Sequence, residues 1–183
     1  MTKRLFTMIA LCIFCCTFAA TAQTSNRETF DMKMDTDGRF KRTGDQQFFV
    51  VNFPGKKASQ LYSDVLAHLS QCYVYPDRVT DKVQDRSIVI NGYEDNLMGI
   101  SGKTGHVDIK YRVEIQFKDG RIRMNLPEIR EYIIITPSAT LNFEGAQLPH
   151  VIAYGVSEAL SKPVQYFKVL YGALAYGLQN DDW

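Results

Sequence analysis

The feature that most constrains the fold is a strictly alternating run that doubles back on itself between residues 107 and 126. Apolar residues occupy every second position from Val107 to Phe117, and polar or charged residues fill the positions between them. Asp119-Gly120 is a two-residue turn of the kind that closes β-hairpins. The alternation resumes after this turn and continues to residue 126. The run therefore predicts two long antiparallel strands.

A two-residue turn also sets the register of the hairpin. The expected pairs are Lys118 with Arg121, Phe117 with Ile122, Ile115 with Met124, and Val113 with Leu126. Every apolar residue then lies opposite another apolar residue, and a slip of one position would break all of these matches. The hairpin thus has one apolar face, which we expect helices to cover, and one polar face open to water.

Other patterns place further strands and helices around this hairpin. Alternation or β-rich composition predicts strands at residues 30–40, 46–53, 87–93 and 132–136. A helical period predicts a helix at residues 57–73, and two helical pieces around Pro163 follow residue 150. The second piece has an apolar stripe at positions 167, 170, 174 and 178, and the first at 152, 156 and 160. Residues 98–105 and 137–149 are expected to be loops.

This order of elements predicts the fold class and the division of the chain. The class is α+β, with a single antiparallel sheet, helices packed on one face and the order β-α-β(4)-α. Residues 23–45 form an N-terminal tail and first hairpin, and residues 46–183 form a single α+β domain. The length suits one hydrophobic core.

The first residues have the three parts of a secretory signal peptide. Lys3 and Arg4 precede an apolar, uncharged run at residues 5–20, and Ala20-Thr21-Ala22 is a small-x-small cleavage site. We expect residues 1–22 to be removed and the protein to be exported, to the periplasm or to association with the outer membrane. An uncleaved anchor is the alternative, but the run is short for a span of about 20 residues. No transmembrane helix is predicted after cleavage.

Cysteine usage and charge narrow the kind of protein further. Three of the four cysteines lie within residues 1–22, so Cys72 would be the only cysteine of the mature chain and no internal disulfide is possible. Cleavage removes Lys3 and Arg4 and no acid, which leaves 19 basic and 20 acidic residues and a formal net charge of −1. Nucleic-acid-binding domains are normally strongly basic, so nucleic acid is not an expected partner.

Several short segments resemble a known family. They are Asp37-Gly38, Gln60-Leu61-Tyr62, Ile90-Asn91-Gly92-Tyr93, and the stretch from Ile109-Lys110-Tyr111-Arg112-Val113 into Lys118-Asp119-Gly120-Arg121-Ile122-Arg123. With them, roughly residues 30–130 resemble DUF4468, a domain of unknown function with a TBP-like fold found in exported proteins of Gram-negative bacteria. The resemblance implies a β-α-β-rich-α arrangement and supplies no catalytic residues. DNA binding does not follow from the name of a fold.

Motifs for cofactors, metals and catalysis are incomplete. Gly102-Lys103-Thr104 lacks the first glycine of a phosphate-binding loop, because Leu97 occupies that position. A calcium loop containing Asp35 and Asp37 would need carboxylates at positions 33 and 44, which are lysine and glycine. The histidines His68, His106 and His150 have no zinc-ligand spacing. We therefore expect no cofactor and no metal, and we expect a non-enzymatic protein rather than an enzyme.

The polar face of the hairpin is the candidate site. Its basic residues are Lys110, Arg112, Lys118, Arg121 and Arg123. Lys118 directly opposite Arg121 is mildly repulsive, so this pair does not serve stability. We interpret the face as the contact surface of an exported cell-envelope binding or interaction module, whose partner is an anionic glycan, a peptide or an envelope protein.

Three other interpretations stay open. The polar face can be an ordinary solvated sheet face. An envelope hydrolase could use His106 and Asp108, which would point to the same side of a strand. A structural subunit could assemble through the aromatic residues of its C-terminal helices, which are Tyr154, Tyr166, Phe167, Tyr171 and Tyr176.

Overall fold

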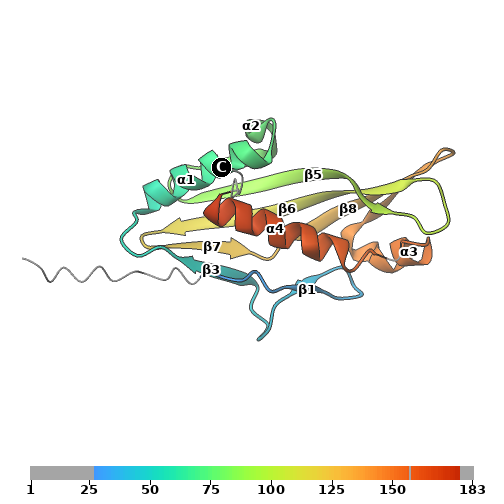
Figure 1. Ribbon diagram of the computed structural model, residues 1–183, viewed down its shortest axis with the longest axis horizontal. Helices are drawn as coiled ribbons and strands as arrows, with labels where there is room; N and C mark the ends of the chain where they lie inside the picture. Colours follow the sequence, from blue (N-terminus) through green and yellow to red (C-terminus); the bar gives the residue numbers. More distant parts are fainter. Residues whose placement is uncertain (1–26, 157, 178–183) are drawn as a thin grey trace, which may run out of the picture.

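The computed structural model describes residues 27–156 and 158–177, which form an α+β fold (Figure 1). A seven-stranded antiparallel sheet contains β3 (Phe48–Asn52), β4 (Thr80–Val83), β5 (Ser87–Gly99), β6 (His106–Lys118), β7 (Arg121–Asn125), β8 (Glu128–Ile135) and β9 (Thr140–Glu144). A separate two-stranded ribbon contains β1 (Lys33–Met34) and β2 (Phe40–Lys41). The helices are α1 (Ala58–Cys72), α2 (Pro76–Val79), η1 (Gly145–Gln147), α3 (Leu148–Ala153) and α4 (Lys162–Tyr176).

Strand β6 organises the sheet. The sheet order is β3-β7-β6-β5-β4, and β8 also pairs with β6 and carries β9. The first half of β6, as far as Arg112, pairs with β8, while its last residues from Ile115 pair with β7. Strand β5 pairs along the opposite edge of β6 over almost its whole length. The two halves of β6 therefore have different neighbours, which decides the surroundings of the predicted site.

The predicted hairpin is confirmed for its first pairs. Lys118 lies opposite Arg121, Phe117 opposite Ile122 and Ile115 opposite Met124. The fourth predicted pair, Val113 with Leu126, does not form, because β7 ends at Asn125. The N–H of Leu126 instead donates to the carbonyl of Gln47, at 2.8 Å, and Pro127 then directs the chain into β8.

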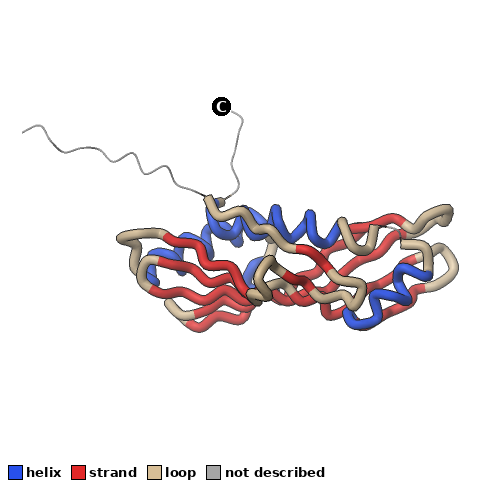
Figure 2. Tube along the Cα trace, turned by 90° about the horizontal axis from the view of Figure 1, so that it is seen from below, coloured by secondary structure: helices blue, strands red, loops and turns tan. Residues whose placement is uncertain are grey.

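Helices cover one face of the sheet, and the opposite face stays open (Figures 1 and 2). Helix α1 buries Leu61, Tyr62, Val65 and Leu69. Helix α4 contributes Phe167, Leu170, Tyr171 and Leu174, and all of these side chains join one core cluster. The predicted α+β class, with an antiparallel sheet and helices on one side, is confirmed. No helix among the described residues is both long and apolar enough to cross a membrane.

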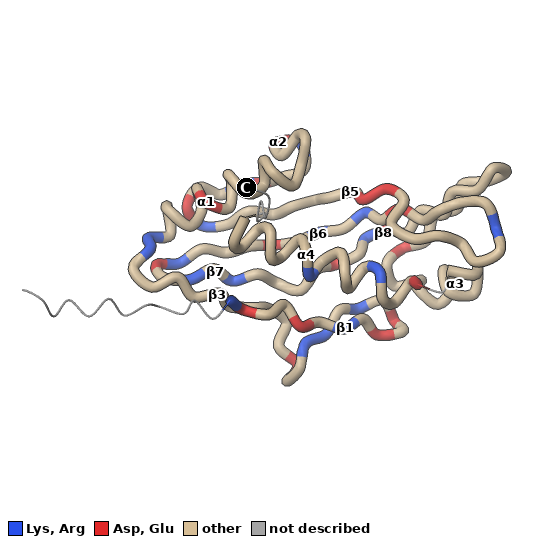
Figure 3. Tube along the Cα trace, viewed as in Figure 1, with Lys and Arg blue, Asp and Glu red and all other residues tan. Residues whose placement is uncertain are grey.

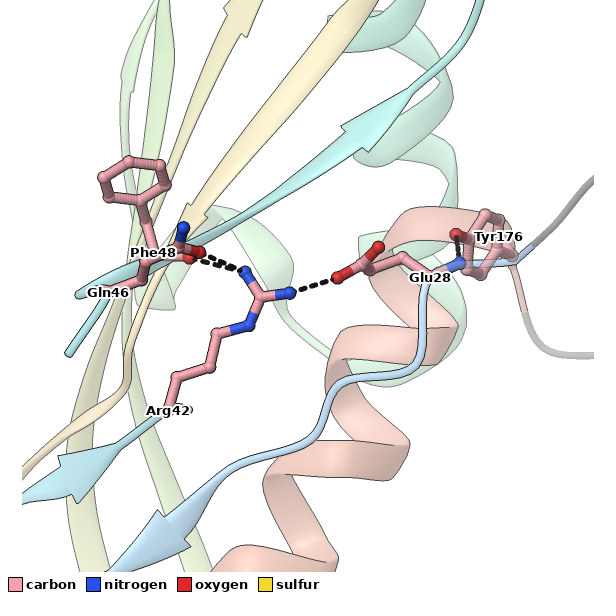
Figure 4. A network of polar contacts seen from close by, with 5 residues as sticks. All are labelled: Glu28, Arg42, Gln46, Phe48 and Tyr176. Atoms are coloured by element: carbon pink, nitrogen blue, oxygen red, sulfur yellow. Dashed lines mark hydrogen bonds and ion pairs between the residues drawn. The ribbon is translucent and has the colours of Figure 1, made fainter. Parts of the chain in front are cut away.

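The N-terminal segment packs onto the same core. Phe30, Met32, Met34 and Phe40 are buried in the cluster that the sheet and helices form. Figure 4 shows how polar contacts hold this segment. The guanidinium of Arg42 donates to the carbonyl of Phe48 at 3.1 Å, to Gln46 Oε1 at 2.9 Å and to Glu28 Oε1 at 2.6 Å. The Glu28 N–H donates to the hydroxyl of Tyr176 in α4, at 2.7 Å. The segment is thus tied to both β3 and α4.

The structure corrects several predicted boundaries. Strand β5 continues to Gly99 instead of ending at residue 93, and β4 was not predicted at all. The loop expected at residues 137–149 contains β9, η1 and the start of α3. Ile152, placed on an apolar stripe, is exposed, while Leu148 and Val151 are buried in its place. The predicted signal peptide at residues 1–22 and the stripe position 178 lie outside the described residues.

Candidate functional site

Three of the five predicted basic residues gather around one shallow pocket. Lys118, Arg121 and Arg123 line a cavity of about 230 Å³ on the open face of the sheet, which we call the cation pocket. Phe48 and Val50 of β3 and Gln116 of β6 complete its lining. Figure 3 marks the basic positions along β6 and β7 in blue. The two-residue turn and the pairing of β3 with β7 bring these three strands together.

The other two predicted residues lie in a different part of the face. The Nζ atom of Lys110 forms an ion pair with Glu131 of β8, at 2.6 Å, and Arg112 lies 3.8 Å from Glu114. Each of these cations therefore already has an acidic neighbour inside the protein. The structure does not bring Lys110 and Arg112 into the cation pocket.

The cation pocket has a surplus of positive charge. Within residues 27–156 and 158–177, no acidic side chain forms an ion pair with Lys118, Arg121 or Arg123. The guanidinium of Arg123 lies over the ring of Phe48, 4.0 Å from its centroid, and its Nε donates to Asn125 Oδ1 at 3.1 Å. These contacts fix the direction of Arg123 without neutralising it. Three cations thus face solvent from a preformed surface.

A larger cavity adjoins the cation pocket at Arg123. This ribbon pocket, of about 620 Å³, lies between the β1–β2 ribbon, the end of β7 and η1. Arg39, Lys41 and Gln47 line it together with Arg123 and Asn125, and Phe40, Leu126 and Ile129 add apolar surface. The sequence did not indicate this cavity, because its walls come from segments about 80 to 100 positions apart that only the fold brings together.

Phe48 was also missed. The run Phe48-Phe49-Val50-Val51 is apolar at every position, so its alternation cannot tell which side faces the helices. In the structure Phe49 and Val51 are buried, and Phe48 and Val50 face the open side. Because the run is apolar at every position, the sequence did indicate that apolar residues lie on both faces of this strand, including the open one.

His106 and Asp108 do lie together, as the alternative interpretation requires. The Nε2 atom of His106 lies 3.4 Å from Asp108 Oδ1. Asp108, expected on the solvated face, is instead 1% exposed. Its carboxylate accepts hydrogen bonds from the hydroxyl of Tyr93 and from the N–H of Asn96, the latter at 2.8 Å. The hydrogen bond from the Tyr93 hydroxyl to Asp108, more than burial, raises the pKa of Tyr93 to about 12.

The histidine–aspartate pair lacks the rest of a nucleophilic site. Hydrolysis by a side-chain nucleophile needs a hydroxyl or thiol within hydrogen-bond reach of the base. In the described part of the chain, no serine, threonine or cysteine side chain is hydrogen-bonded to His106. No group of three or more His, Cys, Asp or Glu residues in those same segments is arranged to hold a metal ion.

Comparison with known proteins agrees with this fold. The model of the family described as a domain of unknown function (DUF4468) with TBP-like fold matches residues 49–132. A TBP-like protein from Parabacteroides distasonis is 14% identical with a TM-score of 0.55, over 74% of this chain and 92% of that chain. A DUF4468 family protein from Bacteroides ovatus is 11% identical with a TM-score of 0.52, over 82% of this chain and 94% of that chain. No curated protein matches. Residues 49–132 therefore match the DUF4468 family, and the chain has the TBP-like fold.

Proposed function

We propose that this protein is a non-enzymatic binding module of the cell envelope that holds an anionic partner in the cation pocket. The observation that carries the proposal is the contrast within one sheet face. Lys110 and Arg112 lie beside acidic side chains, whereas Lys118, Arg121 and Arg123 form no ion pair with an acid among the described residues. An external anion would supply the missing partner.

The physical cost of the arrangement supports a binding role. Lys118 and Arg121 lie directly opposite each other on neighbouring strands, and like charges in such pairs are destabilising. A carboxylate or phosphate group between them would relieve this repulsion and form charge-assisted hydrogen bonds. Arginine also presents a planar fork that suits such groups, and Phe48 holds Arg123 in place.

Export to the periplasm, or to association with the outer membrane, is part of the same proposal. Its support is the sequence of the first residues, with a basic start, an apolar run and a small-residue cleavage site. The mass of the chain recovered from the envelope fraction of its host checks this proposal. A chain that begins at Gln23 is the expected result, and a full-length chain in the cytoplasmic fraction would contradict it.

Removing two of the three cations of the cation pocket should weaken anion binding. The test variant combines Lys118→Gln with Arg121→Gln, and the matched control combines Lys110→Gln with Arg112→Gln, which removes the same charge from the same face. The probes are acidic peptides, uronic-acid oligosaccharides and anionic lipid vesicles, each beside a neutral counterpart. A hydrogen bond to a charged group contributes about 1.5–3 kcal/mol, so we expect the test variant to weaken binding at least about tenfold.

The control and the salt dependence decide the outcome. The control variant should change the dissociation constant less than about threefold, because its cations are already paired. Added salt should weaken binding to the unmodified chain, because these charges are exposed to solvent. Equal losses in the two variants, or no binding of any anionic probe, would overturn the proposal.

A further inference from the structure

The cation pocket and the ribbon pocket are two parts of one path along β7. Arg123 lines both cavities, and Asn125, two residues further along the strand, lines the ribbon pocket. The smaller cavity measures about 230 Å³ and the larger about 620 Å³. A ligand that follows this path is therefore elongated. One end of it contacts the basic groups of the cation pocket, and the other end contacts the apolar groups of the ribbon pocket.

The spacing of the groups along the path matches an extended polypeptide. Arg121, Arg123 and Asn125 are alternate residues of β7 and share its open face. Alternate residues of a strand are about 6.7 Å apart, since each residue advances the chain by about 3.3–3.4 Å. A peptide in extended conformation repeats its same-side chains at that distance. Carboxylates at alternate positions of a peptide would therefore have the same spacing as Arg121 and Arg123, so each carboxylate would lie beside one arginine.

The ribbon pocket has a different character. Its two further cations lie close to acids of the ribbon itself, Arg39 at 3.9 Å from Asp37 and Lys41 in an ion pair with Asp35. Glu128, another lining residue, forms an ion pair with Arg130 at 3.1 Å. With its charges largely balanced, this pocket offers the half-buried side chain of Leu126 and the small remaining surfaces of Phe40 and Ile129, which are each 5% exposed. It suits an apolar side chain better than a further carboxylate.

Two amide side chains in the lining of the ribbon pocket, those of Gln47 and Asn125, suit a peptide backbone. Gln47 Nε2 donates to the carbonyl of Asp45 at 3.3 Å, and Asn125 Oδ1 accepts from Arg123 Nε at 3.1 Å. Each amide keeps a further N–H and a further lone pair for a ligand. Peptide groups need both kinds of partner.

We propose that the partner is an extended acidic segment of another protein, which lies along β7. Two alternate carboxylates of the segment bind in the cation pocket at Arg121 and Arg123, and an apolar residue two positions further on enters the ribbon pocket. This inference rests on the proposed function, because it names the chemistry of the anion that the cation pocket holds.

The test compares synthetic peptides by fluorescence anisotropy. The first is acetyl-SESESLS-amide, the second is the reordered acetyl-SEESSLS-amide, and the third replaces leucine by serine in the first. We expect the alternating peptide to bind at least about tenfold more tightly than the other two, since a tenfold change needs only about 1.4 kcal/mol. Equal binding of the alternating and reordered peptides would overturn the inference.

A variant that fills the ribbon pocket separates the two cavities. Ala146 is an exposed residue of the pocket lining, so Ala146→Phe should narrow the pocket without disturbing the core. We expect this variant to bind the leucine peptide about as weakly as the serine peptide, and to bind the serine peptide as the unmodified chain does. Ala139→Phe, at an exposed loop position, is the matched control and should change neither. Circular dichroism confirms that both variants are folded.

The outcomes distinguish this inference from the proposed function. If uronic-acid oligosaccharides or polyphosphate bind more tightly than any peptide, and lose affinity in the Lys118→Gln, Arg121→Gln variant, the cation pocket stands and the peptide partner is wrong. If no anion responds to that variant, both proposals fail. An unchanged preference for the leucine peptide in Ala146→Phe would overturn the part assigned to the ribbon pocket.

Discussion

Replacement of Gly92 by alanine should lower the free energy of unfolding by about 3 kcal/mol, the upper end of the usual cost of overpacking a core. Gly92 lies in β5 directly opposite Tyr111 of β6. A Cβ atom at position 92 would lie 2.2 Å from Cζ of Tyr111 and 2.4 Å from its hydroxyl oxygen. Non-bonded carbon atoms prefer separations of about 3.5–4.0 Å, so either the ring or the strand has to move.

The Tyr111 ring has little freedom to move. It is 1% exposed, and its hydroxyl is hydrogen-bonded to the hydroxyl of Tyr73 at 2.8 Å and to that of Tyr166 at 2.7 Å. Phe167 packs against it edge to face, with 5.0 Å between the ring centroids. Burial raises the pKa of Tyr111 well above its ordinary value, so the hydroxyl stays protonated and keeps both bonds. Displacing the ring would break this chain of hydroxyls.

Urea unfolding measures the effect, and Gly99→Ala is its control. Gly99 belongs to the same strand, but a Cβ atom there would meet nothing within 4 Å. We expect Gly99→Ala to leave stability unchanged or to raise it by about 0.5 kcal/mol, because alanine restricts the unfolded chain. In the background Tyr111→Leu, the cost of Gly92→Ala should shrink, since the ring is gone. Equal effects of the two glycine variants would contradict the steric explanation.

Gly92 also illustrates what the sequence could not predict. It lies in the segment Ile90-Asn91-Gly92-Tyr93, one of those on which the family resemblance was based. Its role depends on lying opposite Tyr111, which requires the register between β5 and β6. The turn at Asp119-Gly120 sets the register of β6 and β7 locally, whereas β5 and β6 are joined by a longer loop and their pairing contains a bulge between Glu94 and Met98. Local rules therefore predicted one pairing and not the other.

Two edge strands escaped prediction for a related reason. Strand β4 has the sequence Thr-Asp-Lys-Val, and none of its residues is buried. It is held by backbone pairing with β5 rather than by an apolar face, so it has no hydrophobic period. Strand β9 is likewise only half-buried at alternate positions. Patterns of hydrophobicity detect strands that bury side chains, and strands β4 and β9 bury almost none.

For the candidate site, the alternation of residues predicted which basic side chains lie on the open face but not which of them have acidic neighbours. Alternation correctly put Lys110, Arg112 and Lys118 on the open face of β6. Which of these cations keeps an acidic neighbour depends on β8, whose Glu131 lies opposite Lys110. That pairing joins positions more than twenty residues apart with a register shift beside it. The sequence could therefore give the set of basic residues but not their division into neutralised and free cations.

Asp108 is the clearest departure from simple alternation, and it leads to the second large effect. Its position in the period predicted a solvated carboxylate, but the bulge of β5 covers it. Asn96, within this bulge, has a φ of +50°, and its N–H donates to Asp108 Oδ1. Replacing Asp108 by alanine should cost about 3 kcal/mol, because the buried carboxylate accepts hydrogen bonds from Tyr93 and Asn96 and each hydrogen bond to a charged group contributes about 1.5–3 kcal/mol.

Two substitutions separate the hydrogen bonds of Asp108 from its location on the strand. Glu114→Ala, on the same side of the same strand, should change stability by less than about 0.5 kcal/mol, because Glu114 is only half-buried and lies at the surface. Asp108→Asn keeps the shape and an acceptor, so its cost should lie between those of the other two variants. If Asp108→Ala and Glu114→Ala are equally mild in urea unfolding, the carboxylate does not hold the bulge.

The titration of Tyr93 tests the same contact independently of stability. Because the hydrogen bond to Asp108 raises the pKa of Tyr93 to about 12, the hydroxyl should ionise near pH 12 in the unmodified chain. In Asp108→Asn the pKa should fall toward the ordinary value of 10.0, as followed by NMR of labelled tyrosine with Tyr93→Phe for assignment. A raised folded-state pKa adds stability below pH 10 that is lost as the pH rises to about 12. The unmodified chain should therefore lose more stability than Asp108→Asn across that interval, and parallel alkaline unfolding curves would show that Tyr93 is not bound to Asp108 in solution.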